Sequence, residues 1–375
     1  MLGLRAGKTR KGSRSGTGRE TEGPAPPKGK MIREGNIWQR FISEDNFILA
    51  ADRAADRKHS KRNVMKFESC RAENLARIRA ALEADEWRPA RYTEKTIHEP
   101  KKRLIKIAPY PDRVVHHAVM NILAPMFEAR FIETSYACRK GKGIHAASLK
   151  TMDYVRHNAW CLKCDISKFY PTMNHEVLLA MVGRIIKDKK FMHMLEHLVR
   201  SVPGDKEVPI GNYTSQWFGN YYLHFLDMFV KHELRVRAYL RYCDDFCLFS
   251  NDKAELQRAR IAIEKFIGEQ LKMRFSKADL FPTTHGVDFV GYRHFKSKIL
   301  LRKSTSKRQM RALRTIPALY QKGKICFERL QSTAASIRGW LDWAQTHNLK
   351  IATKAYELEH FIGEEHDRIK LARAA

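Results

Sequence analysis

The hydrophobic and polar positions of this chain change period along its length, and the change separates helical from extended segments. Residues 68–84 place Leu75, Ile78 and Leu82 on one face of a helix. Residues 99–107 instead alternate basic and apolar side chains, which is typical of a strand with one polar face. The pattern predicts a helical N-terminal region that leads into a first strand.

Turn-forming residues divide the rest of the chain into further elements. Pro109 and Pro111 end the first strand, and a helix is expected to begin near Asp112, with the Asp112 side chain as its cap. Gly211 permits a close approach of the backbone to a ligand, and Ser215 is expected to cap the helix that follows. The other predicted elements are strands at 160–166 and 240–249, helices at 175–186, through 223–229 and at 259–271, and a strand hairpin at 289–292.

The most informative segment is Tyr242-Cys243-Asp244-Asp245, which lies inside an apolar strand pattern. Adjacent carboxylates are costly to desolvate unless a cation or a water-exposed turn receives them. A third carboxylate, Asp165, ends another short strand. Together these side chains can hold two Mg²⁺ ions for an in-line phosphoryl displacement. The alternative interpretation is a polar turn between two strands.

Composition narrows the class of partner. The 375 residues carry a formal net charge of +29, and 43% of them are hydrophobic, so the chain can form more than one packed unit. Nucleic acid is the simplest acidic partner for such a charge, because basic side chains that neutralise phosphates release counterions. The sequence contains no apolar run of membrane-spanning length and no signal-peptide pattern, so we expect no membrane association and a cytoplasmic location.

The seven cysteines do not form a disulfide framework. Cys161 and Cys164 have the spacing of a metal or redox pair, but no second pair matches them. We interpret them as buried, reduced thiols, with a zinc site as the less favoured alternative.

Basic residues gather in three stretches. Residues 1–30 contain eight Lys or Arg among Gly, Ser, Thr and Pro, which predicts a disordered basic arm over 1–35 and leaves Met31 as an alternative start. The glycine-bearing loop within 131–148 includes Arg139 and Lys142, which can approach a nucleotide backbone. Residues 289–327 contain eleven Lys or Arg and no acidic residue. Solvated surface charge is the alternative for each residue alone.

The order of these segments resembles that of reverse transcriptases over approximately residues 99–345. The motifs that carry the resemblance, in chain order, are Asp165 with the aromatic pair Phe169-Tyr170, Gly211 with Ser215, the segment Tyr242 to Asp245, Lys277, and Gly286 to Tyr292. Within the superfamily the chain looks most like the enzymes of diversity-generating retroelements. Most reverse transcriptases have Gln in place of Ile210 and Pro in place of Gln216, and departures at both positions are characteristic of this mutagenic group.

The resemblance implies roles for individual residues. The catalytic set is Asp165, Asp244, Asp245 and Lys277, and the expected metal ligands are Asp165, Ile166, Asp244 and Asp245. The expected dNTP contacts are Arg103, Arg113, Tyr170 as a steric gate against the ribose hydroxyl, Ile210, Gly211 and Gln216. The expected nucleic-acid contacts are Arg139, Lys142, Gly291, Tyr292, Arg302, Lys303, Lys307, Arg308, Arg311 and Arg314. A core aromatic is the alternative for Tyr170, and a surface residue is the alternative for Lys277.

The same resemblance implies an α+β right-hand polymerase, with N-terminal helices and fingers at 36–160, a palm with finger insertions at 161–295, and a thumb with a C-terminal helix at 296–375. It implies Mg²⁺ as cofactor, with Mn²⁺ possible, and error-prone cDNA synthesis opposite template adenines. The expected partners are a template-repeat RNA, cDNA, dNTPs and an oligomeric, basic accessory variability determinant. The resemblance also implies that this chain is encoded by a bacterium, an archaeon or a phage.

Three other functions stay open. A group II intron enzyme is the nearest rival, although we expect no maturase or endonuclease extension after the thumb. A retron or defence-type reverse transcriptase is the second. A non-catalytic, polymerase-like RNA-binding scaffold is the third, and the three intact carboxylates argue against it.

Overall fold

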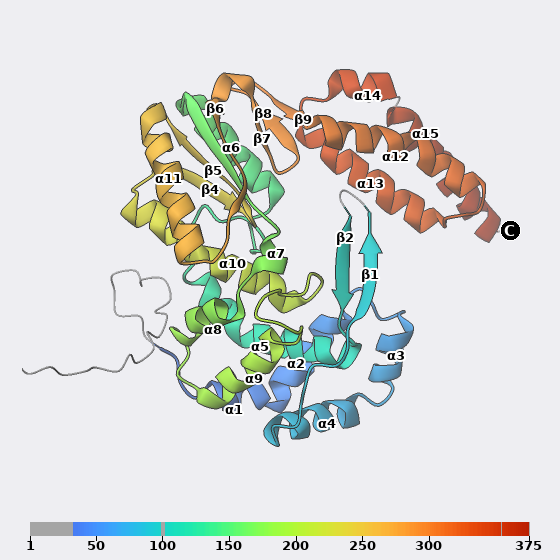
Figure 1. Cartoon of the computed structure of the whole chain (residues 1–375). Helices are drawn as coiled ribbons and strands as arrows, with labels where there is room; N and C mark the ends of the chain where they lie inside the picture. Colours follow the sequence, from blue (N-terminus) through green and yellow to red (C-terminus); the bar gives the residue numbers. More distant parts are fainter. Residues whose placement is uncertain (1–32, 99–101, 354, 375) are drawn as a thin grey trace, which may run out of the picture.

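The computed structural model describes residues 33–98, 102–353 and 355–374. Its centre is a four-stranded antiparallel sheet in the order β4-β5-β3-β6 (Figure 1). The strands are β3 (Trp160–Ile166), β4 (Ala238–Tyr242), β5 (Asp245–Ser250) and β6 (Phe275–Pro282). Most of the predicted basic arm, residues 1–32, lies outside the described residues. Residues 33–35 of that prediction lie within the described residues, and the backbone of Glu34 pairs there with Ile185 and Lys187.

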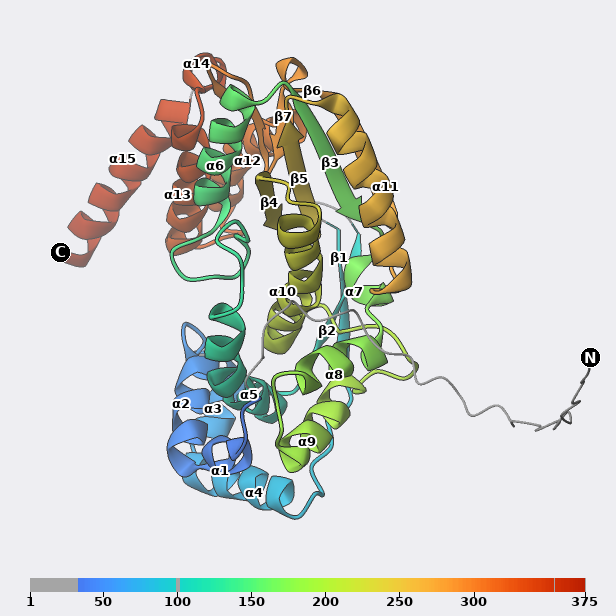
Figure 2. The same ribbon diagram turned by 90° about the vertical axis from the view of Figure 1, so that its left-hand side faces the viewer.

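Strand alternation gives the two faces of this sheet different cores (Figure 2). Leu162, Cys164 and Ile166 belong to the large core beneath helices α10 (Tyr213–Met228) and α11 (Lys253–Glu269). Cys161 belongs to a second core on the opposite face. The elements there are α6 (Ile144–His157) and a hairpin of β7 (Val287–Phe289) and β8 (Tyr292–His294), which pairs with β9 (Ile299–Leu301).

The alternation of side chains along β3 decides whether Cys161 and Cys164 can bind one metal ion together. Cys161 and Cys164 are both buried, but they are three positions apart in β3 and therefore point to opposite faces of the sheet. They cannot act as a pair on one ion. All seven cysteines are free thiols, which confirms the prediction that these two are buried and reduced.

A helical lobe lies at the other end of the molecule, and an antiparallel hairpin projects from it (Figure 1). Its helices are α1 (Ile37–Ile42), α2 (Glu44–Ala55), α3 (Arg62–Glu68), α4 (Arg71–Glu83), α5 (Tyr110–Glu128), α8 (His175–Gly183) and α9 (Lys189–Val199). The hairpin strands are β1 (Thr93–Ile97) and β2 (Arg103–Ile107). Side chains of Ser43, Asn174 and Asp188 cap α2, α8 and α9.

Two predicted helix caps are wrong. Helix α5 begins at Tyr110, and Pro111 lies in its first turn, where a proline fits. The Asp112 carboxylate instead accepts the Ala90 N–H at 2.8 Å. The Ser215 hydroxyl donates to the carbonyl of Pro209 at 2.6 Å, four residues before the start of α10, and so closes the turn rather than capping the helix.

An ion pair with no solvent exposure joins the sheet to α10. Arg241 on β4 contacts Asp227 through two parallel bonds, Nε–Oδ1 at 2.7 Å and Nη2–Oδ2 at 2.5 Å. The hydroxyl of Tyr239 donates to the same carboxylate at 2.6 Å, and Arg241 Nη1 donates to Asn220 Oδ1 at 3.1 Å. This network satisfies every charge that the fold buries there, which a buried ion pair requires.

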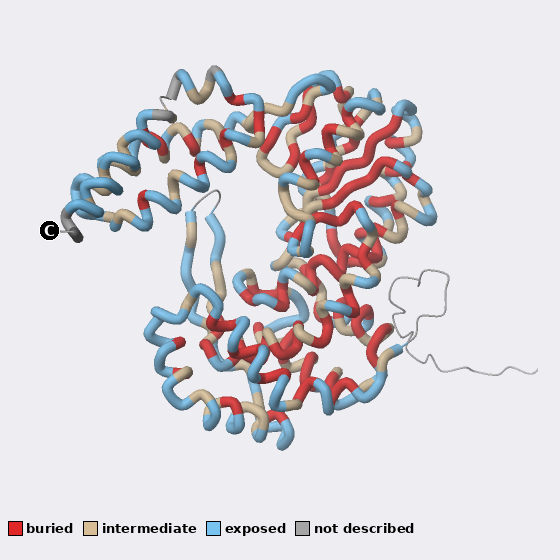
Figure 3. The backbone as a smooth tube through the Cα atoms, turned by 180° about the vertical axis from the view of Figure 1, so that it is seen from behind, coloured by how far each residue is buried: buried red, intermediate tan, exposed pale blue. Residues whose placement is uncertain are grey.

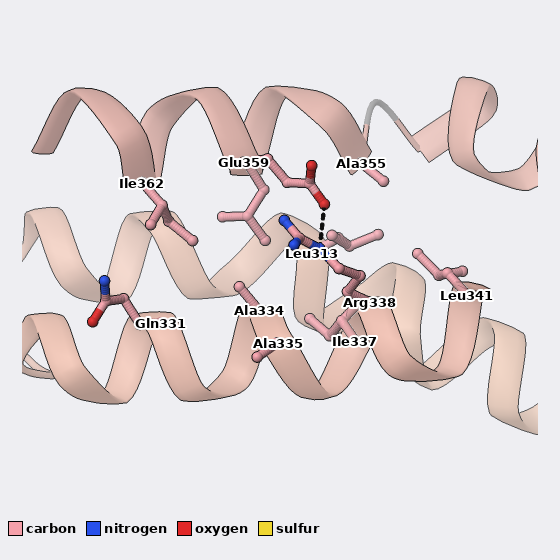
Figure 4. A pocket seen from close by; sticks show the side chains of 11 residues that line it. Leu313, Gln331, Ala334, Ala335, Ile337, Arg338, Leu341, Ala355, Glu359 and Ile362 are labelled. Carbon is pink, nitrogen blue, oxygen red and sulfur yellow. Dashed lines mark hydrogen bonds and ion pairs between the residues drawn. The ribbon is translucent and has the colours of Figure 1, made fainter. Parts of the chain in front are cut away.

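The C-terminal helices have a separate core formed by Leu313, Leu330, Ile337, Leu341 and Leu358. The helices are α12 (Lys303–Gln321), α13 (Phe327–Trp343), α14 (His347–Thr353) and α15 (Ala355–Ala374). Between α12, α13 and α15 they leave a pocket of about 280 Å³, which the Arg338–Glu359 ion pair spans at 2.7 Å (Figure 4). Their outer surfaces are mostly exposed, whereas the sheet and the helices beneath it are mostly buried (Figure 3).

Three short elements complete the description: α7 (Phe169–Thr172), a π-helical turn that continues α10 (Phe229–Glu233), and a 3₁₀ turn before β7 (Thr283–His285). Within the described ranges, no helix is long and apolar enough to cross a membrane.

Candidate active site

The predicted acidic turn lies at the end of the central sheet. Strands β4 and β5 are joined by Cys243 and Asp244, and Cys243 has a φ of 55°. Asp165 is the direct cross-strand partner of Asp245, and Tyr242 pairs with Asp245 on the other side. Cross-strand partners point to the same face of a sheet. The sequence thus places two carboxylates side by side and a third in the adjoining turn.

Asp245 is held in an incompletely satisfied environment. Its Oδ2 accepts from Lys163 Nζ at 3.1 Å, and the same ammonium donates to the carbonyl of Asp288 at 2.5 Å. Its Oδ1 is buried and has no hydrogen-bond partner among the described residues. Burial raises the pKa of Asp245 to about 6, against the opposing effect of Lys163, and Asp165 adds to the increase. An unpartnered carboxylate oxygen beside a second carboxylate fits a divalent cation.

Asp165 is half-buried and is oriented by β6. Ser276 Oγ donates to Asp165 Oδ2 at 2.5 Å and to its carbonyl at 3.1 Å. Lys277 is exposed and is the direct cross-strand partner of Asp165. Ile166, the remaining expected metal ligand, sits at a register shift in β3 with its side chain in the large core. An isoleucine side chain has no ligand atom, so only the main-chain carbonyl can fill this role, which stays a prediction.

The aromatic pair after Asp165 packs beside the acidic turn. The rings of Phe169 and Tyr170 lie 5.0 Å apart on α7. A Cβ at Gly219 of α10 would lie 3.0 Å from the Phe169 ring and 3.3 Å from the Tyr170 ring, so glycine makes room for both. Burial raises the pKa of the Tyr170 hydroxyl, and the charged groups that act on it include Asp244 and Arg103. The structure thus brings Tyr170 near the carboxylates and near β2.

The turn before α10 packs against strand β2. Gly211 has a φ of 126°, and a Cβ there would lie 2.7 Å from the carbonyl oxygen of Lys106. The Lys106 N–H in turn donates to the carbonyl of Ile210 at 3.0 Å. The close approach that the structure describes at Gly211 is made to strand β2, and its contact with a nucleotide stays a prediction. Ile210 is half-buried at this contact, and Gln216 is exposed in the first turn of α10.

The two predicted triphosphate contacts lie close to this turn in the fold. Arg103 opens β2 and is exposed, and Arg113 lies in the first turn of α5, where its Nε donates to the carbonyl of Ala108 at 2.8 Å. The structure brings Arg103 towards Tyr170, whereas it anchors part of the Arg113 guanidinium on the backbone.

The predicted nucleic-acid contacts in the glycine-bearing loop have internal partners. Arg139 is only 7% exposed, and it donates to Glu128 at 2.8 Å and to the carbonyls of Ile132 and Ser135. Lys142 bonds both the carboxylate and the carbonyl of Glu133. The donors of both side chains hold the loop closed, and their contact with a nucleotide backbone stays a prediction.

The predicted hairpin of β7 and β8 packs on α13. Gly291 has a φ of 89°, and a Cβ there would lie 2.7 Å from the Trp340 ring. Tyr292 has no exposed surface, and its ring centroid lies 5.1 Å from that of Trp340. Tyr292 therefore positions the hairpin from inside and does not present its ring to a strand. Trp343 stacks on His145 at 4.1 Å, so both tryptophans pack within the protein.

The basic residues of the third stretch divide into two groups. Lys303, Lys307, Arg311 and Arg314 are exposed on α12, opposite its buried positions Thr305, Gln309 and Leu313. Arg308 lies over the Trp340 ring at 5.8 Å. Arg302 precedes the helix, and its backbone N–H donates to the carbonyl of Gly291 at 3.0 Å, while its charge opposes the increase in the pKa of Asp245 that burial causes. Arg302 thus belongs to the carboxylate site rather than to the exposed face.

Sequence reasoning missed three residues of this site: Lys163, Ser276 and Gly219. A signal existed for Lys163, since it precedes Asp165 by two positions in a strand and must share its face. Ser276 carried a weaker signal as the neighbour of Lys277. Nothing in the local pattern marked Gly219, because its role depends on a ring fifty residues earlier.

Comparisons with known proteins agree with this geometry. Protein YkfC of Escherichia coli (strain K12) is 26% identical over 265 residues, which cover 58% of this chain and 68% of YkfC. Group II intron-encoded protein LtrA of Lactococcus lactis subsp. cremoris is 28% identical over 141 residues, covering 35% of this chain and 23% of LtrA. Nuclear intron maturase 1, mitochondrial, of Arabidopsis thaliana is 30% identical over 87 residues, covering 23% and 12%. The chain spans less than a quarter of these two intron proteins.

A solved structure of apo telomerase from Candida Tropicalis aligns with 68% of this chain and 60% of that chain, at a TM-score of 0.45 and 12% identity. The profile of the family described as reverse transcriptase (RNA-dependent DNA polymerase) matches residues 94–294, which is more than half of the chain. This family implies a divalent metal, an RNA template and a DNA product, and the α+β right-hand polymerase fold predicted from the sequence is confirmed. The chain belongs to the reverse transcriptases, the RNA-dependent DNA polymerases.

Proposed function

We propose that this protein synthesises DNA on an RNA template at the end of its central sheet, with Asp165, Asp244 and Asp245 as the carboxylates that hold Mg²⁺. The observation that carries the proposal is the cross-strand pairing of Asp165 with Asp245, next to the turn that bears Asp244. When bound there, two Mg²⁺ ions supply the activation of the attacking hydroxyl and the stabilisation of the leaving oxygen. We further propose 36–160 as N-terminal helices and fingers, 161–295 as palm and 296–375 as thumb.

The chain's own residues position the reactants around these carboxylates. Lys163 balances the charge of Asp245, and Ser276 fixes the orientation of Asp165. Tyr170 closes the space in which a ribose 2′-hydroxyl would lie, and Arg103 supplies positive charge for a triphosphate. Lys277 donates a proton to the departing pyrophosphate in this proposal, and its support is the cross-strand pairing of Lys277 with Asp165. Alignment and charge neutralisation are the main sources of rate in phosphoryl transfer.

Substitution of single carboxylates tests the polymerase proposal. We expect Asp165→Asn and Asp244→Asn each to lower primer extension on an RNA template by at least about a thousandfold, because each removes charge from the metal site. Glu264→Gln on the exposed side of α11 is the control and should leave extension unchanged. Full activity of both Asn variants would refute the assignment, and a scaffold would keep its biological effect in Asp244→Asn.

We also propose the narrower function of a diversity-generating retroelement enzyme, acting with a template-repeat RNA and a basic accessory variability determinant. Its support is the segment Ile210 to Gln216. An isoleucine contributes only its shape to the pocket and lacks the hydrogen bond that a glutamine would make. Loss of such a bond weakens the enzyme's discrimination against wrongly paired nucleotides. The carbonyl of Ile210 is fixed to β2, so a new side chain there would act from a defined position.

Copying fidelity tests the narrower function. We expect Ile210→Gln to reduce misincorporation at template adenines while other template bases are copied as before. Ile261→Gln, at an exposed isoleucine of α11, is the matched control. An unchanged adenine error frequency in Ile210→Gln would refute the proposed role. A wild-type enzyme with no adenine bias would favour the second candidate, a group II intron-type reverse transcriptase, which the similarity to LtrA supports.

A further inference from the structure

A second group of metal-binding side chains lies in the helical lobe, away from the sheet that carries the carboxylates (Figures 1 and 2). His193 and His197 are one turn apart on α9, and Asp85 follows the end of α4. His193 Nε2 lies 3.1 Å from Asp85 Oδ2 and 3.2 Å from His197 Nε2. His197 Nε2 lies 3.8 Å from Asp85 Oδ1. The three side chains can offer one ligand atom each to a common ion.

These separations match the edges of a tetrahedral zinc site. Zinc binds imidazole nitrogen and carboxylate oxygen at about 2.0–2.2 Å, so two ligands of one tetrahedral ion lie roughly 3.3–3.6 Å apart. Two histidines at positions i and i+4 of a helix share one face and suit such an ion. Without an ion, the two Nε2 atoms compete for a single proton between them. Mg²⁺ fits poorly, because it prefers oxygen ligands.

The surrounding fold holds the three ligands in place. Asp85 has a φ of 58°, and the next two backbone N–H groups both donate to the carbonyl of Ala81. On the other side, Asp188 caps α9 and accepts the Trp38 N–H at 2.8 Å. A pocket of about 180 Å³ opens beside the ligands, and its lining includes Trp38 and Trp87. The side chains of Asp85 and His193 are each 52% exposed, so an ion and a water can reach them.

The charges that face the site leave it available to a cation. Arg88 Nη1 lies 3.6 Å from Asp85 Oδ1, but it also donates to the carbonyls of Asp85 and Trp87. Lys190 lies over the Trp38 ring at 4.4 Å and donates to the carbonyl of Glu83.

We propose that Asp85, His193 and His197 form a Zn²⁺ site with a water in the fourth position. The ion joins the end of α4 to α9 and thereby fixes two parts of the helical lobe that are 108 residues apart in the sequence. Its role is structural, since it lies apart from the carboxylates of the central sheet, and it is independent of the function proposed above. Metal binding to a folded site stabilises the fold.

Metal titration of the full chain tests this site. The protein is stripped with a chelator, and ZnCl₂ is added in excess Mg²⁺ to an Asp244→Asn background, so that the polymerase carboxylates do not contribute. We expect one Zn²⁺ per chain and a rise in melting temperature of roughly 3 °C at about 100 times the dissociation constant. CoCl₂ should give the visible absorption of a tetrahedral Co²⁺ ion.

Variants decide whether these residues are the ligands. His193→Ala, His197→Ala and Asp85→Asn should each lose the stoichiometric Zn²⁺, the melting shift and the Co²⁺ spectrum. His157→Ala is the control, because His157 also lies 3.2 Å from an aspartate, Asp153, but has no second histidine. Circular dichroism checks folding, and Asp85→Asn serves if a histidine variant unfolds. The proposal is overturned if the chain binds no Zn²⁺, or if Zn²⁺ binding and the Co²⁺ spectrum persist in His193→Ala or Asp85→Asn.

Discussion

The loop at residues 139–142 and helix α12 carry the same kind of sequence signal, yet the fold uses their charges in opposite ways. The side chains of Arg139 and Lys142 donate hydrogen bonds to Glu128, to Glu133 and to carbonyls of the loop. The basic positions of α12 lie on its exposed side, and its buried side faces the C-terminal core. A count of positive charges cannot distinguish these cases, because the difference lies in which acids and carbonyls the fold brings near.

The comparison separates two kinds of basic residue by the measurement each should affect. A residue with internal partners should change the stability of the fold when it is replaced. A residue exposed on a helix face should change nucleic-acid binding and its dependence on salt, because exposed charges act on phosphates through counterion release. The predictions below apply this distinction, starting with the most enclosed residue.

The largest effect is expected at Arg241, which is wholly buried against Asp227. Arg241→Met should lower the free energy of unfolding by about 3–5 kcal/mol, because it leaves the Asp227 carboxylate buried without its partner. Urea denaturation measures the change. The double variant Arg241→Met with Asp227→Leu should be clearly more stable than the single one. If the single variant unfolds like the wild type, internal pairing does not govern this residue.

The next effect is expected on α12. Replacing Lys307, Arg311 and Arg314 together by Gln should weaken binding to an RNA–DNA duplex by about a hundredfold near 0.1 M salt, and it should make the salt dependence shallower by about 2–3. Fluorescence anisotropy over a range of KCl concentrations measures the affinity and its salt dependence. Arg139→Gln is the matched control, because it removes one charge from the loop at residues 139–142. An unchanged salt dependence in the triple variant would show that α12 does not contact phosphates.

A smaller effect, on stability, is expected at Arg139 itself. Arg139→Gln should lower the free energy of unfolding by about 2 kcal/mol, because Glu128 and the carbonyls of Ile132 and Ser135 lose a charged donor. Urea denaturation measures it, and Lys303→Gln on exposed α12 should change stability by less than about 0.5 kcal/mol. Loss of duplex affinity without loss of stability in Arg139→Gln would reverse the comparison.

The sequence predicted the acidic turn and its strands well, because two carboxylates inside an apolar period-two pattern admit few arrangements. It also predicted the hairpin ending at Tyr292, and it identified the basic stretch that the structure exposes on α12. The same alternation, applied further, would have separated Cys161 from Cys164 and joined Lys163 to Asp165. These are local properties of single strands and helices.

The hydrophobic and polar pattern could not predict contacts between segments that are far apart in the sequence. Gly211 meets Lys106 of β2, and the sequence shows only that a glycine is present. Asp112 had the right type and position for a cap, but the backbone of Ala90 binds it. Asp85 and the two histidines of α9 come together only because the helical lobe folds α4 against α9. In each case the partner depends on how distant elements pack together, and the sequence of one segment does not determine that packing.

The smallest effect concerns a basic side chain that its surroundings keep neutral. His294 accepts from Ser148 at 2.7 Å and donates to the carbonyl of Val287, and burial lowers its pKa from 6.5 to about 4. As the pH falls, the unfolded chain therefore takes up a proton on His294 before the folded chain does. The contribution of His294 to the free energy of unfolding is thus complete above pH 6.5 and is lost as pH falls towards 4. Between pH 7.5 and 5.5 the loss should be about 1.3 kcal/mol, read from urea denaturation. His294→Gln should remove that part of the pH dependence and exposed His157→Gln should not; equal slopes in all three proteins would mean that His294 titrates normally.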